Sequence, residues 1–276
     1  MNEDKQTKLV KRLYCSQPGR IVLSIITRPW VSRLVGLFMN SRLSTLMIRG
    51  FVADNNIDMS LYENHSYRSF NDFFVRKIRP ECRPVAMDHK LLISPCDGRL
   101  SVHPIDADSV FSIKGQNYDM KQLLGNSELA AKYEGGIMLV FRLTVSDYHR
   151  YHYPDSGVKG ANTRIPGILH TVNPVAAKAR RIYCENTREY FEIQSDNFGD
   201  ILMMQVGALL VGDICNRHRQ AVVSRGQEAG YFEYGGSTVI LCIEKGLAEI
   251  LPEITAQAND VHELPVKMGQ AVGRAI

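Results

Sequence analysis

Beyond about residue 84, the apolar residues occur in short runs that Gly, Pro and Asp residues interrupt, and this pattern restricts what the chain can fold into. Short runs rich in Val, Ile, Leu and Phe and bounded by turn-forming residues are typical of β-strands. We therefore expect a region made mostly of short strands, with candidates at residues 91–93, 136–143, 168–172, 190–193, 201–211 and 237–244.

The N-terminal region has a different, helical pattern and a basic charge. Residues 1–50 contain nine Lys and Arg residues against two acidic ones, a net charge of +7, whereas the whole chain carries +4. From Lys5 to Ala53 there is no acidic residue, and aliphatic runs lie between the basic side chains. Because Pro29 and several arginines interrupt these runs, no apolar stretch of about 18 residues is left to span a bilayer.

This composition favours basic amphipathic helices that lie on an anionic membrane surface. Two alternatives are a helical layer packed on the domain with a solvated cationic face, and a mitochondrial transit segment. Nucleic acid is not expected as a partner, because aliphatic rather than stacking aromatic residues alternate with the basic ones. Six cysteines without a CxxC pair, and an N-terminus unlike a signal peptide, favour reduced thiols in the cytosol. We expect a peripheral protein on the cytoplasmic face of the cell membrane.

The organisation that we expect is of the α+β class. A basic, membrane-associating helical region covers residues 1–60, and a β-rich catalytic domain covers 61–276. Within that domain, residues 69–75 predict a short helix with Ser69 or Asn71 as its N-cap. The tail VKMGQAVGRAI resembles the turns of lipoyl and biotinyl carrier barrels, which predicts barrel-sandwich-like elements, although no Met-Lys-Met attachment site accompanies it.

The sequence GGSTVILCI places Ser237 behind two glycines at the start of an apolar strand. A hydrolase would need a GxSxG turn that leads into a helix, so this serine fits that class poorly. Because Gly236 has no Cβ, the Ser237 hydroxyl can approach the preceding carbonyl, and an N-to-O acyl shift can relieve backbone strain. Elimination from the ester and hydrolysis would then leave a pyruvoyl group at residue 237.

Three further places hold candidate functional residues. Asp97 lies in a Pro-x-Asp-Gly turn, where local hydrogen bonds alone can explain an aspartate. His149 and His152 are three residues apart, and they can share a site or be surface histidines. No metal is expected, because no third ligand has compatible spacing. Gly207 and Gly212 can mark either a core strand or a close ligand approach.

The order of these motifs resembles that of the phosphatidylserine decarboxylases, pyruvoyl enzymes that cut themselves before the serine of a (L/G)GST motif. The resemblance covers essentially the whole chain. The segments that carry it are FNDFFVRKIRPECRPV, SPCDGRL, DYHRYHYPDSG, HTVNP, NTREY, FGDILMMQVGALLVGDI and the stretch from Arg225 to Ile240.

The resemblance implies a role for each matched residue. Asp97 would orient and support His152, and His152 would take the proton from Ser237 as the hydroxyl attacks the Gly236 carbonyl. Cleavage would give a β chain of residues 1–236 and an α chain of residues 237–276, which stay together as a heterodimer that could itself pair. Ser237 would become the covalent pyruvoyl cofactor, and His149 would serve the decarboxylation step.

The implied reaction converts phosphatidylserine into phosphatidylethanolamine and CO₂. The substrate amine would form a Schiff base with the pyruvoyl group, which accepts the electron pair that CO₂ leaves behind, and His149 would donate a proton. An alternative keeps this chemistry but uses a soluble amino acid or another amine. A non-enzymatic carrier module is a third hypothesis, and the absence of a carrier lysine motif opposes it.

The chain departs from the family pattern at three positions. Gly235 stands where one large branch has leucine, Cys96 stands before Asp97 where a small residue is commoner, and Asp213 stands where serine is frequent. The first two positions lie beside the motifs and not in them, so we expect self-cleavage to survive.

Overall fold

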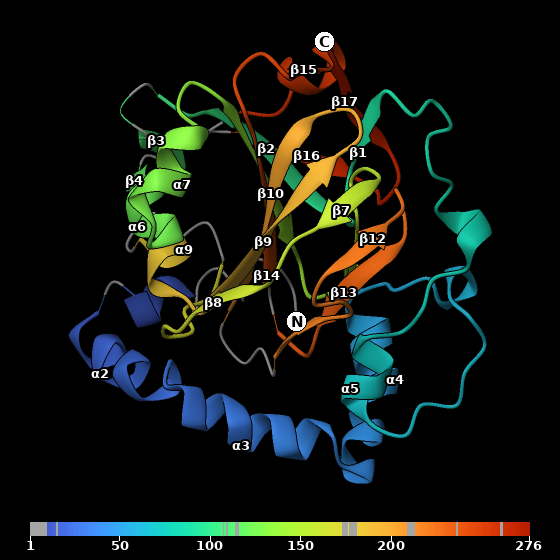
Figure 1. Cartoon of the computed structure of the whole chain (residues 1–276). Coiled ribbons are helices and arrows are strands. Elements are labelled where there is room, and N and C mark those ends of the chain that lie inside the picture. The colour runs from blue at the N-terminus through green and yellow to red at the C-terminus, as the bar shows by residue number, and fades with distance from the viewer. Residues whose placement is uncertain are drawn as a thin grey trace.

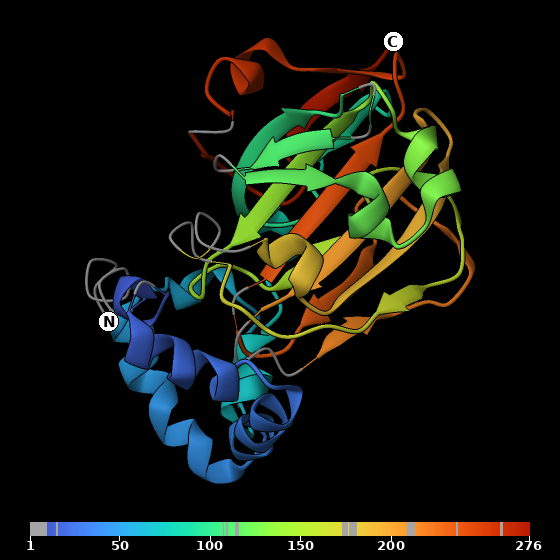
Figure 2. The same ribbon diagram turned by 90° about the vertical axis from the view of Figure 1, so that its left-hand side faces the viewer.

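The computed structural model describes residues 10–14, 16–106, 108, 110–113, 116–172, 176, 181–208, 213–235, 237–259 and 262–276. Gly212 and Gly236, both singled out above, lie outside the described residues. A group of N-terminal helices lies along one end of a β-rich body (Figure 1). The perpendicular view shows that these helices form a layer of their own beside the sheet (Figure 2).

The N-terminal layer consists of successive helices. They are α2 (Gln17–Ile26), α3 (Pro29–Met39), the 3-10 helix η1 (Arg42–Thr45) and α4 (Leu46–Asp54). Ser16 caps α2 by accepting a hydrogen bond from the Gly19 amide at 3.1 Å, and Pro29 is the first residue of α3, where a missing amide hydrogen costs little. The predicted break at Pro29 is confirmed.

No single described helix is long and apolar enough to cross a membrane. Only α2 taken together with Trp30–Met39, bent by 67° at the break between them, reaches the required length and hydropathy.

The outer surface of this layer is strongly apolar. Large apolar side chains that are exposed to solvent are Ile21, Val22, Ile25, Trp30, Leu34, Leu37, Phe38, Leu43, Leu46 and Met47. The inner side packs against the next helix, α5 (Phe70–Phe74), where Met39 and Phe51 contact the buried Phe70 and Phe73. The layer therefore has two apolar sides, and the described part of the chain covers only the inner one.

The short helix predicted near residues 69–75 is confirmed as α5. Its N-cap is Ser69 and not Asn71, because the Ser69 hydroxyl accepts a hydrogen bond from the Asp72 amide at 3.1 Å. Two 3-10 helices lie before and after it, η2 (Met59–Leu61) and η3 (Pro80–Cys82). The domain boundary expected near residue 60 stays a prediction.

Among the described residues, the β-rich body is built on a nine-stranded antiparallel sheet. Its strands follow the order β12 (Ala221–Val223), β7 (Gly157–Lys159), β9 (Arg188–Ser195), β10 (Gly199–Gly207), β14 (Ser237–Ile243), β5 (Ile137–Leu143), β2 (Gly98–Pro104) and β16 (Leu264–Val266), and β8 (Thr163–Ile165) also pairs with β9. All seven residues of β14 are buried between β10 and β5.

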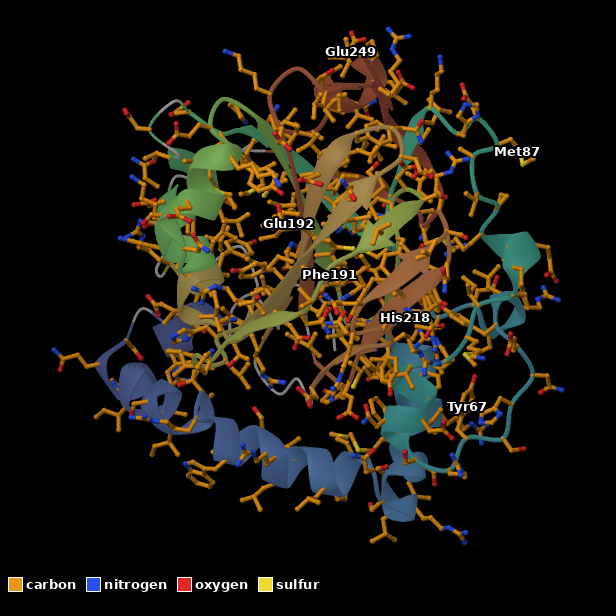
Figure 3. The ribbon with its side chains drawn as sticks, viewed as in Figure 1. Tyr67, Met87, Phe191, Glu192, His218 and Glu249 are labelled. Atoms are coloured by element: carbon orange, nitrogen blue, oxygen red, sulfur yellow. The ribbon has the colours of Figure 1, made fainter. Side chains whose placement is uncertain are left out.

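Alternate residues of β14 point into two separate cores, as the two-residue period of a strand requires. Val239 and Leu241 pack into the first core, and Ile240 and Cys242 pack into the second. The same alternation is visible in β9, where Phe191 enters the first core and Glu192 faces α7 on the other side (Figure 3). The sheet is therefore covered on both faces.

Different elements cover the two faces. The first core is closed by the sheet of β1 (Leu91–Ile93), β17 (Ala271–Ala275) and β15 (Ala248–Ile250), by the sheet of β11 (Ile214–Asn216), β13 (Glu228–Phe232) and β6 (Arg150–His152), and by α10 (Pro252–Thr255). The second core is closed by the hairpin of β3 (Val110–Ile113) and β4 (Gln116–Asp119) and by α6 (Met120–Leu124), α7 (Ser127–Lys132) and α9 (Ile182–Glu185).

The α+β, β-rich class with N-terminal helices is confirmed, and most of the predicted strands exist. Residues 91–93 form β1, and the predictions near 136–143, 190–193 and 237–244 fall on β5, β9 and β14. Strand β10 ends at Gly207, and residues 209–212 lie outside the described ones. The strand predicted at 168–172 is wrong, because Ile168 makes only an isolated bridge and the Leu169 amide donates to Thr27 at the end of α2.

Candidate active site

Ser237 begins β14 at the end of the sheet that faces the N-terminal layer. Its Cα is paired with Leu143 at the end of β5 and with Gly207 at the end of β10. The side chain is fully buried, and its Oγ has no hydrogen-bond partner among the described residues. Gly235 has a φ of 140°, which residues with a side chain rarely adopt, so glycine suits this position.

His149 lies against the segment that precedes Ser237. Its Nδ1 is 2.9 Å from the backbone oxygen of Asp147, which can only accept, so Nδ1 carries the hydrogen and Nε2 has the free lone pair. Nε2 is buried and makes no hydrogen bond to any described residue. Burial lowers the pKa of His149 to about 3, although the backbone oxygens of Asp147 and Gly235 oppose this shift. The ring, 4.1 Å from that of Phe74, is therefore neutral at neutral pH.

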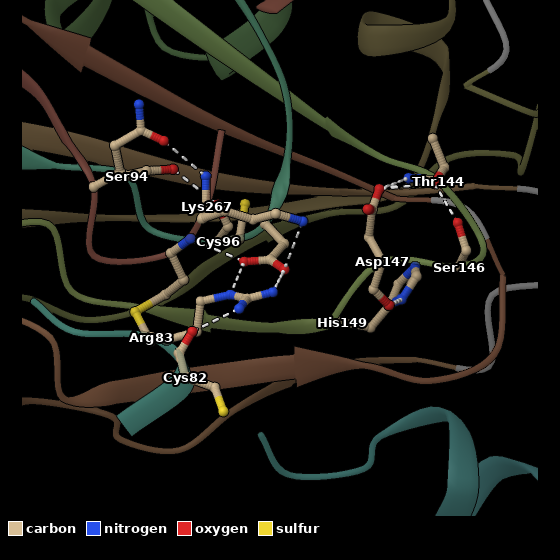
Figure 4. Close-up of polar contacts among 12 residues, drawn as sticks. Cys82, Arg83, Ser94, Cys96, Thr144, Ser146, Asp147, His149 and Lys267 are labelled. Carbon is tan, nitrogen blue, oxygen red and sulfur yellow. Dashed lines mark hydrogen bonds and ion pairs between the residues drawn. The ribbon is translucent and has the colours of Figure 1, made fainter. Parts of the chain in front are cut away.

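The loop that carries His149 is held from two sides. Arg76, only 2% exposed, donates from Nη2 to the backbone oxygens of Ser146 at 3.0 Å and Asp147 at 3.5 Å. The Asp147 carboxylate accepts hydrogen bonds from the Thr144 amide at 2.7 Å and hydroxyl at 2.8 Å (Figure 4). Arg76 thus fixes the carbonyl that accepts from His149.

His152 lies at the end of β6, next to the turn that carries Asp97. Its backbone amide donates to the Pro95 oxygen at 2.7 Å, and its ring lies 5.9 Å from that of Tyr148. The Nδ1 atom is buried and has no hydrogen-bond partner in the described part of the chain. Burial lowers the pKa of His152 to about 4, and the negative charges of Glu228 and Asp97 oppose the shift.

The Asp97 carboxylate is directed toward other residues than His152. Arg83 binds it in a bidentate fashion, with Nε 2.8 Å from Oδ1 and Nη2 2.5 Å from Oδ2 (Figure 4). The Met268 amide donates to Oδ1 at 2.9 Å, and the Lys267 Nζ lies 3.5 Å from Oδ2. Among the hydrogen bonds of the described residues, none joins Asp97 to His152, so the carboxylate acts on the imidazole only through space.

Sequence reasoning missed three charged residues that shape the site. Arg76 and Arg83 were read only as part of a motif, and Lys267 only as part of a barrel-like tail. That tail supplies the Met268 amide and packs beside β1, where the Gly269 amide donates to Ser94 at 3.0 Å. The signal that was present is a basic residue beside apolar ones, as Arg76 follows FFV, because a buried cation needs a partner.

The remaining candidates have simpler places. Gly207 is a buried residue at the end of β10, and a Cβ there would lie 3.3 Å from the Thr187 oxygen. Within the described ranges, no group of three His, Cys, Asp or Glu side chains could hold a metal ion. Asp213 pairs with Arg164 at 3.1 Å on the surface.

The arrangement thus places the neutral His149 imidazole beside the segment that leads to the buried Ser237 hydroxyl, and the neutral His152 imidazole beside the turn that carries Asp97. A neutral imidazole with a free lone pair can accept a proton from a hydroxyl. The carboxylate is fixed by its own cation, so the site differs from a hydrogen-bonded Ser-His-Asp chain.

Comparison with known proteins places the chain in a family. Residues 70–274 match the family model for phosphatidylserine decarboxylase. The chain is 40% identical over 272 residues to the phosphatidylserine decarboxylase proenzyme of Clostridium botulinum (strain 657 / Type Ba4). The matched region covers 96% of this chain and 92% of that protein. The proenzyme of Clostridium tetani is 40% identical over 97% of this chain and 92% of its own length. The proenzyme of Clostridium beijerinckii is 39% identical over 98% of this chain and 93% of its own length. The chain therefore belongs to the phosphatidylserine decarboxylase family.

Proposed function

We propose that this protein converts phosphatidylserine into phosphatidylethanolamine and CO₂, after cutting itself between Gly236 and Ser237. The observation that carries the proposal is the group of buried polar atoms without a partner in the described structure: Ser237 Oγ, His149 Nε2 and His152 Nδ1. Such atoms cost stability, and a catalytic role is one reason why a fold keeps them.

The residues around Ser237 fit a pyruvoyl group at that position. The hydroxyl is fully buried, Gly235 two residues earlier has a φ that disfavours other residues, and the neutral His149 imidazole lies against Gly235. A pyruvoyl group there would supply a carbonyl that condenses with an amine and withdraws the electron pair released with CO₂.

The protein's own residues have separate tasks in this proposal. His152 accepts the proton of the Ser237 hydroxyl, and the charge of Asp97 stabilises the imidazolium that results. His149 lies against Gly235, and its Nε2 has the free lone pair that can first accept a proton and then deliver it to the substrate carbon when CO₂ has left.

The two chains produced by the cut would stay together. Strand β14 belongs to the α chain of residues 237–276, and it lies between β10 and β5, which belong to the β chain. β16 and β17 of the α chain also pair with β2 and β1. Separating the chains would break the strand pairing at the centre of the sheet, so a stable heterodimer is expected.

The N-terminal layer would hold the protein on an anionic membrane. Its exposed apolar side chains, which include Trp30 and Leu34, lie beside exposed basic residues such as Arg28 and Arg49. Apolar insertion and attraction to anionic lipids act together in such surfaces. A peripheral location at the cytoplasmic face of the cell membrane fits this role.

Intact mass under denaturing conditions tests the self-cleavage. We expect two chains, one ending at Gly236 and one of 40 residues beginning with pyruvoyl, whereas Ser237→Ala stays a single chain of about 31 kDa. CO₂ release from phosphatidylserine vesicles, compared with free serine, tests the substrate. A processed protein that decarboxylates only the soluble amine would replace the lipid proposal with the alternative one.

A further inference from the structure

A pocket of about 440 Å³ lies between the N-terminal layer and the body of the protein. It is lined by residues from η1, α5 and β13 and from the segments beside them: Asn40, Arg42, Arg68, Ser69, Asn71, Asp72, Val75, Tyr231 and Glu233. Two of these side chains are guanidinium groups, and most of the rest are polar. Pockets with a few convergent polar groups are common ligand sites.

The pocket is connected to the candidate active site through two elements. Glu233 lies four residues before Ser237 in the chain, on the segment that leads from β13 to β14. Helix α5 forms the other wall, and its Phe74 lies against the His149 ring at 4.1 Å. Asn71 fastens these parts together, because its Oδ1 accepts from the Tyr234 amide at 2.9 Å and its Nδ2 donates to Asn40 at 3.0 Å. A ligand in the pocket would therefore lie beside the segment that carries Ser237.

The pocket holds two guanidinium groups and two acids, Asp72 and Glu233, and burial raises the pKa of the Glu233 carboxyl. No described residue forms an ion pair or a side-chain hydrogen bond with the Arg42 guanidinium. Arg68 lies 3.7 Å from Asp72, and its side chain is 84% exposed. Asp72, in contrast, also accepts from the Arg68 amide at 2.9 Å and lies 3.4 Å from His65. An anion in the pocket would therefore find two guanidinium groups with free donors.

One lining residue of the pocket, Arg42, adjoins the exposed apolar residues of the N-terminal layer. Arg42 is followed directly by Leu43, which is 70% exposed, and Leu46 is 82% exposed at the start of α4. An amphiphile with an anionic group could place its apolar part along these leucines and its anion at Arg42. A small soluble anion would contact Arg42 and not the leucines.

We propose that this pocket binds the phosphodiester of a phospholipid headgroup, with Arg42 and Arg68 as its ligands, and so holds the substrate for reaction at residue 237. The inference rests on the proposed function and adds the part of the protein that recognises phosphate. Arginine suits this task, because its planar fork matches two phosphate oxygens at once and keeps its charge at every physiological pH. The residues of the proposed chemistry, Ser237, His149 and His152, do not recognise phosphate themselves.

The test uses the full-length protein with Arg42→Gln and Arg68→Gln, singly and combined. The substrate is phosphatidylserine in micelles of an uncharged detergent, so that attraction to an anionic bilayer does not contribute. We expect the combined variant to be cut normally, to keep kcat within about twofold and to raise KM at least tenfold, because the phosphate loses both of its charged hydrogen-bond donors.

Arg33→Gln is the matched control. It removes the same charge from an exposed position of α3 that does not line the pocket, so KM should stay unchanged. An equal rise of KM in the control and in the combined variant would overturn the proposal in favour of a general charge effect. If the combined variant is not cut, binding of glycerophosphoserine to the Ser237→Ala precursor, with and without the two substitutions, decides instead.

Soluble competitors distinguish the sources of the phosphate. Glycerophosphoserine should inhibit the wild type and lose at least tenfold in potency against the combined variant, while inorganic phosphate should inhibit far more weakly. Equal inhibition by both would reduce the pocket to a general anion site and overturn the headgroup assignment. A wild type that is uncut or releases no CO₂ would contradict the proposed function, whereas an active wild type with an unchanged combined variant would contradict only the pocket.

Discussion

Ser237, His149 and His152 each keep a buried polar atom without a partner among the described residues. Each such atom costs about 1–3 kcal/mol, because water no longer satisfies it. A stable fold accepts this cost where a reaction needs the atom free, so the cluster has the physical character of an active site.

Arg76 is expected to set both the position and the proton affinity of His149. In Arg76→Met, the carbonyl of Asp147 loses its charged donor, and the positive charge that lowers the pKa of His149 disappears. We expect kcat/KM to fall about tenfold and the acid limb of its pH profile to move to higher pH.

Arg76→Lys separates the two effects, because it keeps the charge and loses the fork. Its acid limb should stay near that of the wild type while kcat/KM still falls. If kcat/KM of Arg76→Met falls but the acid limb of its pH profile does not move, Arg76 has only a structural role.

The ion pair of Arg83 and Asp97 makes a separate prediction about stability. The side chains are 9% and 2% exposed, so Arg83→Met leaves a buried carboxylate with only the more distant Lys267 ammonium and the Met268 amide as partners, and should cost about 3 kcal/mol. Urea unfolding in the uncut Ser237→Ala background measures this free energy without chain separation. Adding Asp97→Asn should recover part of the loss, and a strictly additive double variant would mean that the pair does not couple.

The sequence was sufficient to predict which residues would matter, but not how Asp97 would be bound. Ser237, His149, His152 and Asp97 stand in a recognisable order. The partner of Asp97, however, depends on an arginine 14 positions earlier and an amide 171 positions later. Such a choice follows from the packing of distant elements and leaves no local pattern.

At the scale of elements, the strands that could be predicted are those with a continuous apolar run. Strand β14 is recognisable because all its residues are buried and most are apolar. Strands β6 and β7 are only three residues long and include polar residues, so they depend on pairing with neighbouring strands. Residues 168–172 show the opposite error, since Ile168 makes only an isolated bridge, the Leu169 amide donates to the Thr27 oxygen and Val172 packs into the second core. The carrier-like tail consists of a turn, whose Lys267 and Met268 contact Asp97, followed by strand β17.

The exposed face of α3 predicts membrane attachment. Leu34→Gln with Leu37→Gln should weaken binding to phosphatidylserine vesicles by at least about tenfold, because burying each leucine in lipid is worth about 1.5–3 kcal/mol. Both leucines are exposed, at 58% and 70%, and glutamine preserves the helix. Vesicle co-sedimentation measures the effect.

Met87→Gln is the control for that experiment. Met87 is 93% exposed on a loop of the body, away from the N-terminal layer (Figure 3). Its replacement should leave vesicle binding unchanged. If the double leucine variant sediments with vesicles as the wild type does, α3 does not contact the membrane.

At the scale of the whole molecule, the two buried histidines should make stability depend on pH. The pKa values of His149 and His152 are about 3 and about 4 in the folded chain, below the ordinary 6.5. Between these values and 6.5, the two histidines bind protons in the unfolded chain and not in the folded chain. The free energy of unfolding should therefore fall as the pH drops below about 6.5, by roughly 1 kcal/mol per pH unit for each histidine. Urea unfolding of the Ser237→Ala precursor between pH 7 and 5 measures this slope.

Replacing both histidines by glutamine in that precursor should flatten the slope over the same interval, where most carboxylates stay ionised. An unchanged slope would mean that the histidines are already protonated in the folded chain. This would also remove the basis for treating them as proton acceptors.

The position of β14 inside the sheet has a consequence for the lifetime of the enzyme. An inner strand needs both neighbours before it is held, and in the precursor it is tethered to them by a continuous chain. After the proposed cut, that tether is gone, and a denatured molecule would have to recover its strand from solution in a bimolecular encounter. Each molecule can thus mature only once, and the finished enzyme owes its persistence to slow unfolding rather than to an ability to refold.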